Sequence, residues 1–247
     1  MGKADLHIHT RVSDGMATVE AVLAYVQEKT DLDLIAVTDH EDVTGGLRAR
    51  ELAAQRGYRF EVTPGAEVTT MQGHLIAIGI EVTPKSFRRV ESTLEMIHSQ
   101  GGVAIVPHPM SWLTRSLSER TIARICARAE AGVTFDAIET ANPSPAGKLR
   151  RQQAIHRNRT EWRLAETGGS DAHHLVHIGT GWTEFEGQGS AGLRTAIEGR
   201  TTRGVMRPYP SLREVGYGQA AMGLAWGYAA TPRKVAADVA RRWGRGR

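Results

Sequence analysis

Short apolar runs of strand length alternate with helix-patterned segments through about the first 200 residues of this 247-residue chain. Strands alternating with helices favour parallel βα units. Seven or so such units in about 200 residues predict an α/β barrel, with an open doubly wound sheet as the alternative. The predicted strands are residues 4–8, 34–37, 60–63, 74–80, 103–106, 135–139, 164–167 and 179–185, and the predicted helices are 19–28, 46–56, 87–99, 118–131, 146–158 and 191–198.

The pattern changes after residue 204, which we take as a domain boundary between a barrel (1–204) and a C-terminal extension (205–247). Residues 205–218 are rich in Pro and Gly, and residues 232–243 have the pattern of a short basic amphipathic helix. From Arg200 onward the chain has ten Lys or Arg against two Asp or Glu, whereas residues 1–199 have a net charge of −4. The basic character therefore lies in the extension, either as a solvated helix or as a site for nucleic acid or another anionic surface.

Secretion and membrane insertion find no support in the sequence. No apolar segment follows Met1, and no window approaches the roughly 18 apolar residues that span a bilayer. The one cysteine, Cys126, excludes a disulfide within the chain. We therefore expect a cytoplasmic protein without a transmembrane segment.

Histidines and carboxylates gather where the predicted strands end. His7 and His9 close the first strand, and residues two apart on a strand face the same side. Loops at the carboxyl ends of barrel strands build active sites. Six of the ten histidines lie at strand ends together with two carboxylates, namely His7, His9, His40, His74, His108, His173, Glu67 and Asp171.

Imidazole and carboxylate together are the ligand set of Zn²⁺, Mn²⁺ or Fe²⁺. With about nine candidate ligands and three or four protein ligands per ion, two or three divalent ions fit. Closely spaced ions activate water as a hydroxide nucleophile and clamp the attacking and leaving oxygens of a displacement. The sequence thus predicts a metal-dependent hydrolase with a di- or trinuclear site.

Six motifs in order resemble the polymerase and histidinol phosphatase (PHP) family over roughly residues 4–200. They are Asp5-Leu6-His7-Ile8-His9-Thr10, Ser13-Asp14-Gly15, Thr38-Asp39-His40, Pro64-Gly65-Ala66-Glu67, Pro107-His108-Pro109 and Ser170-Asp171-Ala172-His173. The resemblance implies a distorted (β/α)₇ barrel with up to three metal ions. Many small members related to nucleotide phosphatases carry an inserted helical domain before the Pro-His-Pro motif. Here only 33 residues separate His74 from His108, so the insertion is missing and the substrate of those relatives does not carry over.

Carried over by position, the resemblance implies three ligand sets. His7, His9, Glu67 and Asp171 would hold one ion, Glu67, His74 and His108 a second, and Asp14, His40 and His173 a third. We take Glu67, Asp171 and Arg11 as the catalytic residues, with the Arg11 guanidinium pairing with a substrate phosphate.

Three further residues are secondary candidates. Asp39 neighbours His40 and is expected to orient a ligand imidazole. Arg115 lies in the loop after His108, and Asn142 follows a predicted strand, so both are expected near the pocket.

The function that these observations favour is hydrolysis of a phosphoester, with a small phosphorylated substrate or a nucleotide as the preferred class. Three alternatives stay open. The chain could be an exonuclease acting on single-stranded nucleic acid through its basic tail, a non-catalytic metal-binding regulatory module, or a hydrolase of a non-phosphate bond, because fold does not fix reaction.

Overall fold

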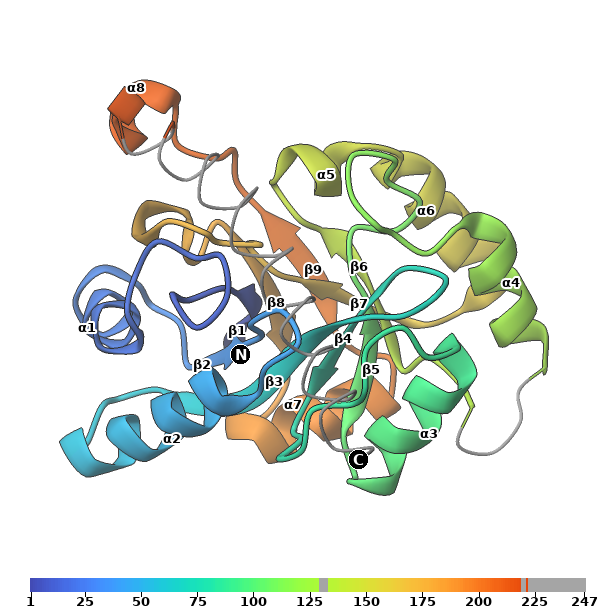
Figure 1. Cartoon of the computed structure of the whole chain (residues 1–247), viewed down its shortest axis with the longest axis horizontal. Helices are drawn as coiled ribbons and strands as arrows, with labels where there is room; N and C mark the ends of the chain where they lie inside the picture. The colour runs from blue at the N-terminus through green and yellow to red at the C-terminus, as the bar shows by residue number, and fades with distance from the viewer. Residues whose placement is uncertain (129–132, 219–220, 222–247) are drawn as a thin grey trace, which may run out of the picture.

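The computed structural model describes residues 1–128, 133–218 and 221. Within them a nine-stranded sheet curls into a nearly closed barrel with helices on its outside (Figure 1). The strands are β1 (Gly2–Ile8), β2 (Leu34–Val37), β3 (Glu61–Thr69), β4 (His74–Ile78), β5 (Val103–Val106), β6 (Ala137–Ala141), β7 (Ala165–Gly168), β8 (Gly181–Phe185) and β9 (Arg203–Met206). The helical segments are α1 (Val19–Lys29), α2 (Thr44–Arg56), α3 (Val90–Ser99), α4 (Glu119–Arg128), α5 (Pro145–Lys148), α6 (Arg151–Arg157), η1 (Asn158–Trp162), η2 (Leu175–His177), α7 (Gly189–Glu198) and α8 (Leu212–Val215).

The expected α/β barrel is confirmed, but its strands are not all parallel. The order is β7-β6-β5-β4-β3-β2-β1-β8-β9. β4 is antiparallel to both β3 and β5, and β8 is antiparallel to both β1 and β9. The short connection between β3 and β4 explains the first reversal, because a parallel return needs a crossover of a dozen or more residues.

Most predicted elements differ from the observed ones by a few residues at one end, and two differ more. β3 runs to Thr69, beyond the predicted residues 60–63, because its first half pairs in parallel with β2 and its second half pairs with β4. The predicted helix 146–158 is divided into α5 and α6, since Arg150 adopts a left-handed conformation with φ of 61°. The bounds predicted for β2 and β5 agree with the structure.

The barrel interior is apolar at one end and polar at the other. Leu6, Leu34, Ile76 and Ile105 from four strands form one buried cluster, and Leu193 and Ile197 of α7 belong to it as well. α7 thus closes one end of the barrel with side chains that the strands can pack against. The histidines and carboxylates gather at the opposite end.

Glycines allow β7, at one end of the sheet, to approach β8 and β9 at the other end. A Cβ atom at Gly168 of β7 would lie 2.2 Å from the Trp182 carbonyl oxygen of β8, and one at Gly204 of β9 would lie 2.4 Å from the Thr167 oxygen. The Thr183 hydroxyl also accepts a hydrogen bond from the Gly168 amide at 2.8 Å. Only a residue without Cβ fits at such a close backbone approach.

The sheet continues through β9 to Met206, two residues past the boundary predicted at residue 204. The predicted basic helix 232–243 lies outside the described residues, so the division into barrel and extension stays a prediction. Among the described residues, no helix has the length and apolar character needed to cross a membrane.

Candidate metal centre

Glu67 lies at the centre of a ring of histidines. It is 1% exposed and stands on the second half of β3. Its Oε1 atom lies 2.8 Å from His74 Nδ1 and 3.0 Å from His108 Nε2. Its Oε2 atom lies 3.3 to 3.4 Å from the Nε2 atoms of His7, His9 and His40. The two carboxylate oxygens therefore face two different groups of imidazoles.

Two aspartates complete the cluster on the Oε2 side. Asp171 Oδ1 lies 3.5 Å from Nε2 of both His7 and His9. Asp14 Oδ2 lies 3.2 Å from His173 Nε2 and 3.7 Å from His40 Nε2. A carboxylate from the loop after β1 and one from the loop after β7 thus meet around the same histidines.

The topology explains why these side chains converge. His7, His9, His40, His108 and Asp171 lie at or just after the carboxyl ends of parallel strands, which share one edge of the barrel. His74 is the first residue of β4, but because β4 runs antiparallel its start lies at that same edge.

All nine predicted ligands fall into overlapping groups of three whose ligand atoms lie within 4.8 Å of one another. The groups are His7-His108-Asp171, His7-His9-Glu67, His9-Asp171-His173, His9-Asp14-His40 and His40-Glu67-His74. They overlap so heavily that they do not divide the residues into the three sets that the resemblance implied. The assignment of ligands to individual ions therefore stays a prediction.

The side chains present fit divalent cations. Both imidazole nitrogens of His9 and Nδ1 of His40 are buried and have no hydrogen-bond partner among the described residues. Buried polar atoms are normally satisfied, so such atoms at one site point to a ligand. The nitrogen and carboxylate donors suit Zn²⁺, Mn²⁺ or Fe²⁺.

The protonation states of the two carboxyl groups and of His40 point the same way, whereas nearby carboxylates outweigh burial and raise the pKa values of His7, His108 and His173. Burial opposes ionisation of Glu67, but the imidazoles packed round it hold the pKa of its carboxyl well below the usual range. The same balance of burial against neighbouring imidazoles lowers the pKa of Asp171. Burial lowers the pKa of His40 to about 4, which keeps its ring neutral. Ionised carboxylates and a neutral imidazole are the forms that bind metal.

Glu139 on β6 is a functional candidate that the sequence reasoning missed. Its Oε1 atom accepts a hydrogen bond from His7 Nδ1 at 2.8 Å, and its Oε2 atom accepts one from the His108 amide at 2.7 Å. Asn142, expected near the pocket, donates to the same Oε2 atom at 2.9 Å. The sequence did contain a signal for Glu139, since it is an acidic residue near the end of a buried strand. Glu139 fixes the His7 tautomer that turns Nε2 toward the cluster.

We expect Glu139→Gln to weaken Mn²⁺ binding and kcat/KM by about 10–100-fold, the usual effect of losing a partner behind a ligand imidazole. The amide keeps the shape of the side chain but weakens the hydrogen bond that aims His7. Calorimetric titration of metal-free protein with Mn²⁺ measures the affinity. Glu166→Gln is a matched control, because Glu166 pairs with Arg159 away from the cluster. Equal affinities in the two variants would contradict the assigned role.

The expectation for Asp39 was wrong. In the part of the chain that the structure describes, its carboxylate accepts no hydrogen bond from an imidazole, but it accepts hydrogen bonds from the amides and hydroxyls of Thr10 and Ser13, at 2.5 to 3.1 Å. Short side chains with both an amide and a hydroxyl within reach satisfy the carboxylate better than His40, which points away into the cluster. Asp39 thus fixes the loop that carries Asp14.

Arg11 is exposed at the edge of this loop, and its Nε atom donates to the Met16 carbonyl at 2.9 Å. That contact orients the guanidinium. The pairing of Arg11 with a substrate phosphate stays a prediction.

Tyr209, which follows β9, also contacts the site and gave no sequence signal. Its hydroxyl donates to the backbone carbonyls of Ser170 and Asp171, the latter at 3.0 Å, and its ring stacks on His177 with centroids 4.0 Å apart. Asp171 has a positive φ of 54°, which is uncommon for a residue other than glycine. Tyr209 therefore supports the loop that presents Asp171.

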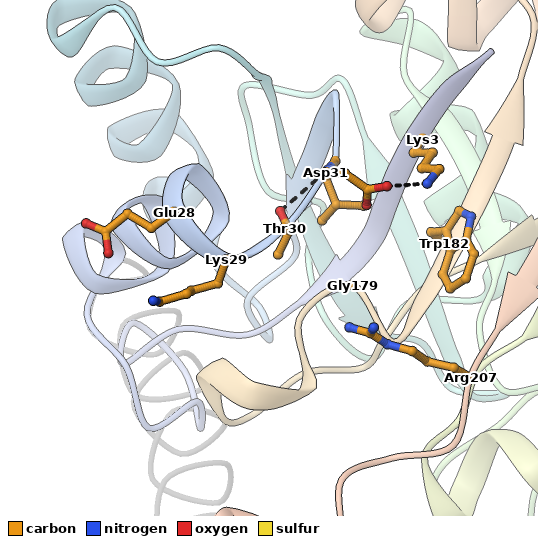
Figure 2. A pocket seen from close by; sticks show the side chains of 9 residues that line it. Lys3, Glu28, Lys29, Thr30, Asp31, Gly179, Trp182 and Arg207 are labelled. Atoms are coloured by element: carbon orange, nitrogen blue, oxygen red, sulfur yellow. Dashed lines mark hydrogen bonds and ion pairs between the residues drawn. The ribbon is translucent and has the colours of Figure 1, made fainter.

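A separate pocket of about 520 Å³ lies between the end of α1 and strands β1 and β8 (Figure 2). Lys3, Lys29, Trp182 and Arg207 line it, and Lys3 is paired with Asp31. None of the nine candidate ligands is among its lining residues. The pocket is therefore distinct from the candidate metal centre.

Comparisons with known proteins identify the family and the fold. Residues 152–202 match the family model described as PHP-associated. An uncharacterized protein of Methanocaldococcus jannaschii is 35% identical over 130 residues, which cover 48% of this chain and 74% of that protein. A solved two-domain protein from Bacteroides vulgatus, containing a predicted PHP-like metal-dependent phosphoesterase, has the same fold, with a TM-score of 0.65, 20% identity and coverage of 83% of this chain and 64% of that one.

Two named enzymes match over shorter stretches. The 5′–3′ exoribonuclease Rnm of Escherichia coli is 32% identical over 83 residues, or 32% of this chain and 28% of the enzyme. The 3′,5′-nucleoside bisphosphate phosphatase of Chromobacterium violaceum is 40% identical over 86 residues, or 33% of this chain and 29% of the enzyme. The chain thus spans less than a third of either enzyme. Together with the match to the PHP-associated family model and the shared fold, these relatives show that the chain belongs to the PHP family.

Proposed function

We propose that the chain is a metal-dependent phosphoesterase that hydrolyses a phosphomonoester or a nucleotide at a site for two or three divalent ions. The observation that carries the proposal is the position of Glu67, whose two oxygens face separate groups of histidines. A carboxylate in that position suits a bridge between neighbouring cations. The family's named relatives, a phosphatase and an exoribonuclease among them, support the reaction class.

Divalent ions bound here would activate water as the nucleophile and neutralise charge on the phosphoryl group. The residues of the chain provide the rest. His7, His9 and Asp171 would hold the cations deep in the barrel end, where each is at most 11% exposed in its side chain. Glu139 and Tyr209 would fix the geometry of this set, and Arg11 would bind a phosphate oxygen at the rim.

Manganese, zinc and iron are the proposed metals, because the donors are imidazole nitrogens and carboxylate oxygens without a thiolate. In the described residues Cys126 lies on α4, away from the cluster, and burial raises the pKa of its thiol to about 11. Such a thiol is a poor metal ligand.

Exonuclease activity on single-stranded nucleic acid is the second candidate. The relative in Escherichia coli and the exposed Trp112 beside the site favour it, because an exposed indole offers a stacking platform for a base.

A substrate panel distinguishes these candidates. Purified chain supplied with Mn²⁺ is incubated with sugar phosphates, nucleoside monophosphates and a 5′-labelled single-stranded oligonucleotide, with chelator-treated protein as the blank. We expect metal-dependent release of phosphate from a monoester. Release of mononucleotides from the oligonucleotide instead would favour the exonuclease, and equal signals with and without metal would reject both.

A further inference from the structure

The loop between β5 and α4 carries an unusual exposed side chain. Trp112 is 72% exposed and its neighbour Leu113 is 51% exposed. Large apolar side chains are costly to leave in water, so two together on one loop mark a contact surface.

The loop is attached to the candidate metal centre at both of its ends. It begins at His108, whose Nδ1 atom lies 2.7 Å from the hydroxyl of Ser116 near the loop's far end. The Met110 amide donates to the Leu117 carbonyl at 3.0 Å, and the His74 amide donates to the Arg115 carbonyl at 2.5 Å. The loop tip is thus held in place beside His74 and His108.

Two neighbouring loops extend the same surface. The Met71 amide, in the β3–β4 turn, donates to the Arg88 carbonyl at 2.8 Å, and the Phe87 amide donates to the Thr69 carbonyl at 2.7 Å. Met71 is 62% exposed and Phe87 is 38% exposed. We call Met71, Phe87, Trp112, Leu113 and Arg115 the rim surface.

The rim surface is cationic as well as apolar. The Arg115 guanidinium lies 5.6 Å from the centroid of the Phe87 ring and, within the described part of the chain, forms no ion pair. A guanidinium above an aromatic face is a cation–π contact that keeps the charge available to an anion. Aromatic side chains next to a free arginine suit a ligand with a planar ring and a phosphate, whereas a purely apolar partner would leave the charge unmatched.

We infer that the rim surface binds the nucleotidyl part of the substrate, with its base stacked on Trp112 and its phosphoryl group between Arg115 and the candidate metal centre. This inference rests on the proposed function and narrows it from phosphoesters in general to esters that carry a nucleobase. The rim surface is attached to His74 and His108. A base stacked on the rim surface and a phosphoryl group at the metal centre can therefore belong to one substrate. Leu113, Met71 and Phe87 border the base and exclude water from it.

Kinetics with matched substrates tests the inference. Adenosine 5′-monophosphate and ribose 5-phosphate share the same ester and differ in the base. We expect Trp112→Ala to raise KM for the nucleotide about tenfold, because the base loses its stacking contact, and to leave ribose 5-phosphate hydrolysis unchanged. Trp112→Phe should restore most of the affinity, and Glu81→Gln on the outer surface should change neither substrate. An equal effect of Trp112→Ala on both substrates, or no effect, would overturn the inference.

A binding measurement separates failure of the inference from failure of the proposed function. Titration of the full chain with adenosine 5′-monophosphate should quench tryptophan fluorescence, and Trp112→Phe should remove that quenching, whether or not the ester is hydrolysed. Quenching without hydrolysis of any ester would refute the phosphoesterase but keep the base-binding surface. Absence of quenching in a protein that hydrolyses phosphoesters would refute the surface. Dissociation of a dimer by Trp112→Ala, with nucleotide binding unchanged, would assign the rim surface to a second copy of the chain and overturn the inference.

Discussion

Replacing Glu67 with glutamine is expected to reduce kcat by more than the ~10²–10³-fold that loss of a single transition-state contact costs. Glu67 is buried with Oε1 2.8 Å from His74 Nδ1 and Oε2 3.4 Å from His40 Nε2. Glutamine keeps the volume but removes the charge and turns an amide NH₂ toward one group of imidazoles. If Glu67 bridges two cations as proposed, a neutral amide would not replace it, because two positive ions so close together need a shared anion.

Metal content measured by mass spectrometry, together with kcat on the preferred ester, checks this expectation. The Glu67→Gln protein should hold at least one ion fewer per chain than the unchanged protein. Glu81→Gln is the control, because Glu81 pairs with Arg50 on the surface, 2.9 Å away. If Glu67→Gln retained full metal content and activity, the bridging role would be wrong and the site would be built around another carboxylate.

Removing the metal ions is expected to lower the melting temperature by about 5–10 °C relative to protein at a hundredfold excess of Mn²⁺ over its Kd. Binding to the folded state alone contributes about 2.7 kcal/mol at that excess. One kcal/mol shifts Tm by roughly 2–4 °C in a domain of this size. The physical reason is that Glu67 and Asp171 are both ionised and buried, so cations relieve a charge cluster that exists only in the folded chain.

Differential scanning fluorimetry with increasing Mn²⁺, after treatment with a chelator, measures the shift. The Glu67→Gln protein is the matched comparison and should show a much smaller response to metal. A similar rise in Tm for both proteins would indicate binding away from the cluster, for example at surface carboxylates.

The periodicity of the sequence was sufficient for the barrel, but not for the direction of every strand. The bounds of β2 and β5 followed from their uninterrupted apolar runs, because such runs are long enough for a strand and too short for a helix. The antiparallel directions of β4 and β8 did not follow, since an apolar run carries no information about which way its strand runs. The long β3 was also missed, because its second half is buried by pairing with β4 rather than marked by its own pattern.

Some residues of the candidate site could likewise be predicted from the sequence, and others could not. The nine candidate ligands could be predicted because they occur in motifs at strand ends. The carboxyl ends of barrel strands share one edge, so residues in such motifs lie close together. Glu139 and Tyr209 could not, because their importance depends on contacts with His7 and with the Asp171 carbonyl, residues distant in the chain. Asp39 lay in a predicted motif, yet its contacts with Thr10 and Ser13 differ from the expected one.

The sequence by itself determined the fold class, the residue types of the metal centre and their order along the chain. These depend on local periodicity and on the chemistry of single side chains. Only the tertiary structure decided that the two oxygens of Glu67 face different histidines, and that three separate loops form the rim surface around Trp112. Those features arise from the register and direction of strands, which bring together atoms that no pattern along the chain connects.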